Sequence, residues 1–140
     1  RDCLLSRGLG DVYKRQDNMG HTYGDDLISG FARILKETFE KEAVVGRMGG
    51  DEFIVIIRSD DGRIDYETFR KKLQHVIDEY NHKESRFKYS VACGYADSTE
   101  AGDNNGNVDA RQIYSMADDR MYVHKRKIKE KMKQEKSHNE

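Results

Sequence analysis

The sequence predicts a single α/β domain. Stretches with helical apolar spacing alternate with short β-branched runs, and a length of 140 residues suits one hydrophobic core. Charged and apolar residues each make up 36% of the chain, and 25 basic against 26 acidic side chains leave a net charge of -1. Because this balance gives no general attraction to polyanions, we expect no nucleic acid and no direct membrane contact among the partners.

Residues 1–16 carry no sustained period of 2 or 3.6, and the pattern changes abruptly after them. We leave this segment unassigned and expect it to be foreign to the domain, as a sequencing or gene-prediction artefact would be. The first residue is arginine rather than methionine, so we expect a fragment of a longer protein. The domain is expected at residues 17–129, with a charged C-terminal tail at 130–140.

Apolar residues recur at four-residue steps between residues 24 and 42, which predicts a core-facing helix with Asp25 or Asp26 as its N-cap. Two short apolar runs then flank Gly49-Gly50-Asp51-Glu52. This arrangement predicts a buried hairpin with both acids at its turn, where the glycines permit positive φ.

A second helix is expected from about residue 65 to residue 81, with Asp65 as its N-cap, followed by a strand at residues 89–96. Residues 97–108 are rich in Asp, Asn, Gly and Ser, which predicts a loop. Helical spacing resumes at Ala110, and the charged residues at its end are expected to fray or to meet a partner helix.

Cellular location is predicted from what the sequence lacks. Cys3 and Cys93 show neither metal-site spacing nor a disulfide framework, and no apolar stretch of about 20 residues suggests a spanning helix. We therefore expect a cytoplasmic protein, although a longer parent could still be anchored in a membrane.

Asp51 and Glu52 are two neighbouring acids at the predicted turn, and they have two possible interpretations. Two neighbouring carboxylates can simply solvate a hairpin tip. An apolar strand follows them directly, however, so they would lie at the edge of a cavity, where a carboxylate can hold a divalent cation. Mg²⁺ prefers a few carboxylate oxygens together with substrate phosphates and water, which suits a nucleoside triphosphate.

Gly49-Gly50-Asp51-Glu52-Phe53 resembles the signature of the GGDEF family, whose typical members are diguanylate cyclases. Three further stretches resemble that family in the right order: Gly20-His21-x-x-Gly24-Asp25, the run SVACGYA at residues 90–96, and Ala117-Asp118-x-x-Met121-Tyr122-x-x-Lys125. The likeness covers residues 17–129, about four-fifths of the chain.

The resemblance implies a fold like that of nucleotidyl cyclases and polymerase palms, a ferredoxin-like antiparallel sheet with flanking helices. It implies a homodimer in which two GTP-loaded domains face each other and condense two GTP into cyclic di-GMP and pyrophosphate, with Mg²⁺ or Mn²⁺ as cofactor. It also implies bacterial second-messenger signalling, controlled by an upstream sensor or regulatory domain in the full-length protein.

The same resemblance assigns site residues. Asp51 becomes the metal-binding and catalytic acid, and Glu52 a catalytic helper in the same polar cluster. The residues assigned to GTP binding are His21, Asp25, Gly49, Gly50, Lys125 and Lys129. Asp25 could instead cap a helix, and each lysine could be one more solvated charge. Asp118 receives no chemical role.

The chain departs from the family pattern before Gly20. The family's first strand carries a metal-binding Asp and a guanine-reading Asn, and these positions hold Leu9 and Gln16 here. We therefore expect the domain to lack its first strand, which belongs in the middle of the sheet. The alternative function is a catalytically impaired domain that binds GTP as a regulatory module, and a folded dimerisation unit is a third possibility.

Overall fold

The computed structural model describes residues 2–9, 20–39, 43–58, 65–83 and 89–139, with the side chains of residues 2–9 and 20–23 outside the description. In this part of the chain the elements are β1 (Asp2–Leu9), α1 (Gly20–Thr38), β2 (Ala43–Gly49), β3 (Glu52–Arg58), α2 (Tyr66–Lys83), β4 (Val91–Asp97) and α3 (Ala110–His138).

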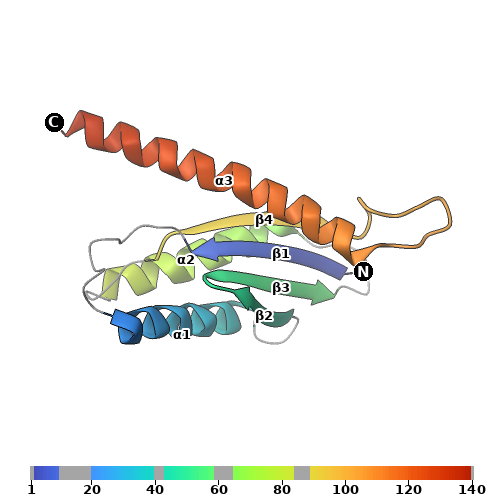
Figure 1. The fold of residues 1–140 in the computed structure, drawn as a ribbon, viewed down its shortest axis with the longest axis horizontal. Coiled ribbons are helices and arrows are strands. Elements are labelled where there is room, and N and C mark those ends of the chain that lie inside the picture. Colours follow the sequence, from blue (N-terminus) through green and yellow to red (C-terminus); the bar gives the residue numbers. More distant parts are fainter. Residues whose placement is uncertain (1, 10–19, 40–42, 59–64, 84–88, 140) are drawn as a thin grey trace.

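The strands form one antiparallel sheet. Their order is β2-β3-β1-β4, and each neighbouring pair is antiparallel. Helices α1 and α2 lie on one side of the sheet, and α3 lies on the other (Figure 1). The predicted hairpin, the two helices before the last strand and the ferredoxin-like antiparallel sheet are therefore confirmed. Contrary to the prediction, the hairpin is not buried as a whole, because β2 lies at the edge of the sheet and none of its residues is buried.

Strand β1 occupies the centre of the sheet. Its residue Leu5 pairs with Val55 of β3 on one side and with Tyr95 of β4 on the other. The expectation that the domain lacks a central strand is therefore wrong for this structure, because residues 2–9 provide the backbone partners that β3 and β4 would otherwise miss. The foreign origin of this segment stays a prediction, and Gln16 lies outside the described residues.

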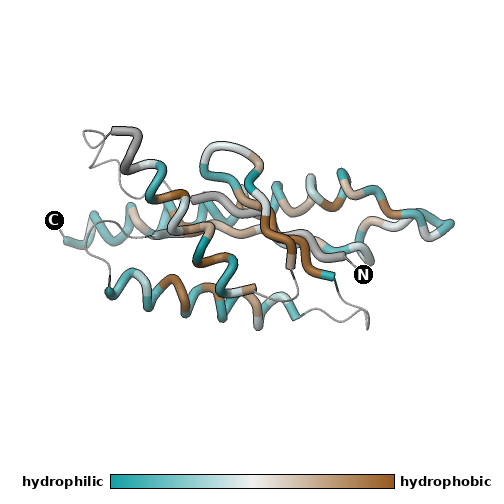
Figure 2. Tube along the Cα trace, turned by 90° about the horizontal axis from the view of Figure 1, so that it is seen from below, coloured by the Kyte–Doolittle hydropathy of each residue, from teal (hydrophilic) through white to brown (hydrophobic). Residues whose placement is uncertain are grey.

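The larger hydrophobic core lies between the sheet and helices α1 and α2. The Phe31 ring is central to it, with ring centroids 5.2 Å from Phe53 and 5.7 Å from Tyr89. The buried members are Phe31, Ile34, Leu35, Phe39, Phe53, Val55, Ile57, Leu73, Ile77, Tyr89, Val91 and Cys93. Figure 2 shows how apolar residues run along the strands and recur along the helices, so the predicted apolar stripes mark buried faces.

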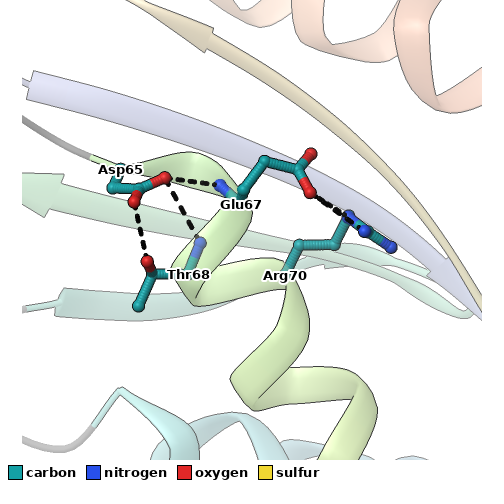
Figure 3. A network of polar contacts seen from close by, with 4 residues as sticks. All are labelled: Asp65, Glu67, Thr68 and Arg70. Carbon is teal, nitrogen blue, oxygen red and sulfur yellow. Dashed lines mark hydrogen bonds and ion pairs between the residues drawn. The ribbon is translucent and has the colours of Figure 1, made fainter.

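Asp65 caps α2, as predicted. Its carboxylate accepts hydrogen bonds from the backbone N–H groups of Glu67 and Thr68, at 3.1 and 3.3 Å, and from the Thr68 hydroxyl at 2.8 Å (Figure 3). Helix α1 begins earlier than predicted, at Gly20. Asp25 and Asp26 therefore lie inside the helix, and the prediction that one of them is its N-cap is wrong.

Helix α3 runs without a break to His138. The charged residues expected as a separate or fraying tail thus belong to the helix, whose last turns extend past the strands (Figure 1). Asp109 caps its start by accepting the backbone N–H of Arg111 at 2.9 Å. None of the described helices is long and apolar enough to cross a membrane.

Candidate active site

Two glycines and one hydrogen bond from a side chain to the backbone define the shape of the turn between β2 and β3. Gly49 and Gly50 have φ values of 151° and 51°, a range that side-chain-bearing residues rarely adopt. The strand register shifts between Arg47 and Gly49, and Arg47 Nε donates a hydrogen bond to the Gly50 carbonyl oxygen at 2.9 Å. These features explain why this turn requires glycines, and Arg47 is a stabilising residue that the sequence analysis did not identify.

The two acids of the turn have different surroundings. Asp51 is exposed at the tip, whereas Glu52 is half-buried. Side chains alternate along β3, so Phe53 enters the core against α1 and α2 while Glu52 lies on the α3 side of the sheet. There the Tyr114 hydroxyl donates a hydrogen bond to Glu52 Oε1 at 2.9 Å. Asp51 is thus available to a ligand, and Glu52 is tied to the protein.

Tyr114 and Asp118 lie one turn apart on α3, and both contact Glu52. Burial, followed by the hydrogen bond and the charge of Glu52, raises the pKa of Tyr114 to about 12, which keeps the phenol protonated as a donor. Burial and then the charge and hydrogen bond of Glu52 also raise the pKa of Asp118. Neither residue had a predicted role, although their i,i+4 spacing indicates a shared helix face.

Lys125 and Lys129 continue the same side of α3. At 3.6 residues per turn, positions 114, 118, 125 and 129 fall within about 60° of one another around the helix. Lys125 is half-buried and Lys129 is exposed. Lys125 lies about 10 Å along the axis from Asp118, at 1.5 Å per residue. One stripe of the helix therefore carries both the contacts to Glu52 and the two candidate phosphate-binding lysines.

Two of the predicted GTP-binding residues, His21 and Asp25, belong to α1. Asp25 is exposed, and it makes no hydrogen bond or ion pair within the described part of the chain. The side chain of His21 lies outside the described residues. Binding of GTP by His21 and Asp25, with Asp25 accepting hydrogen bonds from guanine, therefore stays a prediction.

The acids of the turn were also predicted to hold a metal ion. Among the described residues, no three His, Cys, Asp or Glu side chains are grouped as a metal site. The exposed Asp51 carboxylate fits a magnesium ion that arrives with a nucleotide, because Mg²⁺ is commonly held by one or two protein carboxylates together with phosphate oxygens and water. Asp51 is the residue that would hold it.

Helix α3 approaches β4 closely at Gly94. A Cβ atom at this position would overlap the carbonyl oxygen of Ala117 and the backbone nitrogen of Met121. The absence of a side chain at Gly94 therefore sets the distance between helix and strand, and it explains a glycine in the predicted strand.

Two side chains of α3 also bind the backbone of β4. His124 Nδ1 accepts the Cys93 N–H at 2.9 Å, and Arg120 Nη1 donates to the Tyr95 carbonyl oxygen at 2.6 Å. Arg120 forms an ion pair with Glu100 as well, at 2.7 Å. These contacts fix the middle of α3 on β4 and so help to determine where Lys125 lies relative to the turn.

Comparison with known proteins identifies the family. The family model "Diguanylate cyclase, GGDEF domain" matches residues 11–131. The chain belongs to the GGDEF domain family. This GGDEF chain is 27% identical to the diguanylate cyclase DgcS of Shewanella oneidensis over 119 residues, which are 85% of this chain and 37% of that protein. It thus spans little more than a third of that relative's length.

Solved GGDEF structures share the fold. An EAL/GGDEF domain protein from M. capsulatus superposes with a TM-score of 0.72 at 21% identity, over 90% of this chain and 79% of that one. The GGDEF domain of DgcB from Caulobacter crescentus, solved in complex with c-di-GMP, superposes with a TM-score of 0.67 at 22% identity, over 89% and 72% of the two chains. The predicted fold is confirmed by these superpositions.

Proposed function

We propose that this GGDEF domain condenses two molecules of GTP into cyclic di-GMP and pyrophosphate. The observation that carries the proposal is the Asp51 carboxylate, exposed at a turn whose glycines and Arg47 hold its shape. Membership of the family and the similarity to DgcS, which is a diguanylate cyclase, support the same reaction.

In this reaction the 3′-hydroxyl of one GTP attacks the α-phosphorus of the other and pyrophosphate leaves. A second, equivalent attack closes the ring and releases a second pyrophosphate. One chain carries one signature turn, so two chains must face each other as a homodimer, each presenting one GTP. The protein contributes chiefly by holding the two reactants in line. Mg²⁺ bound with the nucleotide would supply positive charge against the negative charge that develops on the phosphates.

Each residue has a specific part in this proposal. Asp51 would hold the magnesium ion that arrives with the nucleotide, and it helps to deprotonate the attacking hydroxyl. Gly49 and Gly50 let the nucleotide approach the backbone, because no side chain covers it there. Lys125 and Lys129 neutralise phosphate oxygens from α3. His21 and Asp25 contact the bound GTP, with Asp25 accepting hydrogen bonds from guanine.

The test is to incubate the full chain with GTP and Mg²⁺ and to measure cyclic di-GMP. We expect product from the parent and its loss, by at least a hundredfold, in Asp51→Ala. Glu79→Gln is the matched control, since this acid is exposed on α2 and pairs with His75. An inactive parent, or full activity in Asp51→Ala, would refute the proposal.

One observation favours a second function, that of a regulatory module that binds GTP without turning it over. In the sheet, Gly8 pairs with Glu52 and β1 ends at Leu9, so an apolar residue holds the position that the family gives to a metal-binding Asp. Isothermal titration of the chain with GTP and Mg²⁺ discriminates the two functions. Binding without product would favour the module, and binding with product would favour the cyclase.

A further inference from the structure

Strand β4 forms one edge of the sheet, and helix α3 supplies partners for its outer backbone groups. In the described part of the chain β1 is the one neighbour of β4, so every second residue of β4 turns its N–H and C=O groups away from the sheet. Cys93 and Tyr95 are two residues apart and face the same edge. There His124 Nδ1 accepts the Cys93 N–H, and Arg120 donates to the Tyr95 carbonyl oxygen. Two side chains thus take the place of a further strand.

The spacing of these two bonds fixes the helix against the strand. Arg120 and His124 are one helical turn apart, a rise of about 6 Å, and Cys93 and Tyr95 are separated by about 6.7 Å along the strand. Helix and strand run in opposite directions, so one register of α3 on β4 satisfies both bonds. A slide of α3 by one residue, about 1.5 Å, would misalign both bonds at once.

Apolar packing offers little resistance to such a slide. Gly94 lies between the two bonded residues of β4, and the backbone of α3 at Ala117 and Met121 lies directly over it. The buried cluster on this side of the sheet contains small residues and one isoleucine: Ala96, Ala101, Ile113 and Ala117. Few large side chains interlock across this contact. Directional hydrogen bonds are therefore the groups that select one position of the helix.

We propose that Arg120 and His124 are positioning residues, which set the register of α3 on β4 and thereby place Lys125 at the phosphates of bound GTP. This inference rests on the proposed function, in which Lys125 neutralises phosphate oxygens, and it adds the groups that hold this lysine in place. Lys125 follows His124 directly in the helix, so a slide or rotation of α3 at His124 also moves the lysine. A misplacement of about 1 Å is enough to weaken a productive contact.

The first arm of the test compares two substitutions of His124. Asparagine carries Oδ1 where histidine carries Nδ1, so His124→Asn can still accept the Cys93 N–H, whereas His124→Ala cannot. By isothermal titration with GTP and Mg²⁺, we expect His124→Ala to bind about tenfold more weakly and His124→Asn to stay within about threefold of the parent. His75→Asn, at an exposed histidine of α2, is the matched control and should equal the parent. Equal affinities of the two His124 variants would overturn the proposal.

The second arm tests the other bond. Arg120→Met keeps a long side chain without donors, and the arginine side chain is 47% exposed, so the fold should tolerate the change. The substitution also removes the ion pair with Glu100, which Glu100→Gln weakens without touching the bond to Tyr95. We expect about fivefold weaker GTP binding in Arg120→Met and parental binding in Glu100→Gln. Parental binding in Arg120→Met would contradict the role given to this residue.

A double variant tests whether the effect passes through Lys125. Once Lys125→Ala has removed the ammonium group, its placement has no further consequence for GTP binding. Adding His124→Ala to Lys125→Ala should therefore change the affinity by less than about threefold. A further tenfold loss would mean that the bonds of α3 act on GTP by another route, which would overturn the proposal. In the cyclase assay His124→Ala should raise KM for GTP about tenfold and change kcat by less than about threefold.

Amide hydrogen exchange tests the bond itself and needs no turnover. The Cys93 amide should exchange at least about tenfold faster in His124→Ala than in the parent or His124→Asn, because an edge amide without an acceptor is open to water. Parental exchange in His124→Ala would overturn the positioning role whatever the activity. A parent that binds GTP without forming product, with the affinities ranked as above, would refute the cyclase and keep the positioning role. A parent that binds no GTP would refute both.

Discussion

The two faces of the sheet are built differently. Against α1 and α2, large side chains such as Phe31, Leu35 and Leu73 form a continuous core. Against α3, the buried cluster consists of small residues and one isoleucine: Ala96, Ala101, Ile113 and Ala117. Backbone proximity at Gly94 and polar contacts with β4 complete the α3 face.

The two faces of the sheet contribute differently to stability and to function. Burial of large apolar groups dominates folding free energy, so the α1 and α2 face should carry most of the stability. The α3 face buries less apolar surface, and it can therefore accommodate Glu52, Tyr114 and Asp118 with hydrogen-bonding partners. The lysine stripe also belongs to this second face.

The largest loss of stability is expected from Phe31→Ala on the face of the sheet that packs against α1 and α2. Phe31 is fully buried and contacts two aromatic rings, so truncation should lower the free energy of unfolding by about 3–5 kcal/mol. Urea denaturation followed by circular dichroism measures this. Val44→Ala, at a residue 67% exposed on β2, is the control and should change stability little. A loss below about 1 kcal/mol in Phe31→Ala would contradict the assignment of the core.

An intermediate effect is expected from Gly94→Ala on the α3 face. The added methyl overlaps the backbone of α3, which must shift, and overpacking of this kind costs about 1–3 kcal/mol. Hydrogen exchange should show the loss of protection concentrated in α3 and β4, with the α1 and α2 face still protected. Gly102→Ala is the matched control, because nothing lies within 4 Å of its Cβ position. Equal stability of both variants would show that the close approach is unimportant.

The smallest effect is expected from Asp65→Ala, which removes a polar contact from the apolar face. Hydrogen bonds from the Thr68 side chain and backbone hold the pKa of Asp65 below its ordinary value. A lowered pKa in the folded state means that the stabilisation is present above the unfolded pKa, near 3.9, and is lost as pH falls through the folded value. Asp65→Ala should therefore have a slightly lower Tm than the parent at pH 7.

Thermal unfolding of both proteins between pH 7 and pH 2 checks this prediction. The two Tm values should converge as the pH falls, because the parent loses the ionised cap that the variant never had. If the Tm difference between the parent and Asp65→Ala stays constant down to pH 2, the charge on Asp65 does not stabilise the start of α2.

Much of the fold could be predicted because its signals are local. Apolar spacing identified the buried faces of α1 and α2, the Asp65 cap follows from residue type at a helix start, and paired glycines with acids identified the hairpin turn. Strand β1 was missed because DCLLSRGL does not alternate apolar and polar residues, and its place depends on pairing with two strands distant in sequence.

The candidate site was predicted in part for the same reason. The motif placed Asp51 at an exposed turn, since the acid and the glycines are neighbours in the chain. The capping role given to Asp25 or Asp26 failed because α1 begins upstream of both. The bond between Tyr114 and Glu52 joins residues 62 positions apart, and no local pattern specifies such a contact.

That sequence separation has a consequence for how the domain matures. During synthesis the acidic turn leaves the ribosome long before Tyr114 does, and closing so long a loop is a late and slow event in folding. A nascent or truncated chain that stops before α3 would display the complete signature and still lack the Tyr114 hydroxyl that binds Glu52 and both candidate phosphate-binding lysines. Catalytic competence would then require synthesis of the last helix as well as of the signature motif.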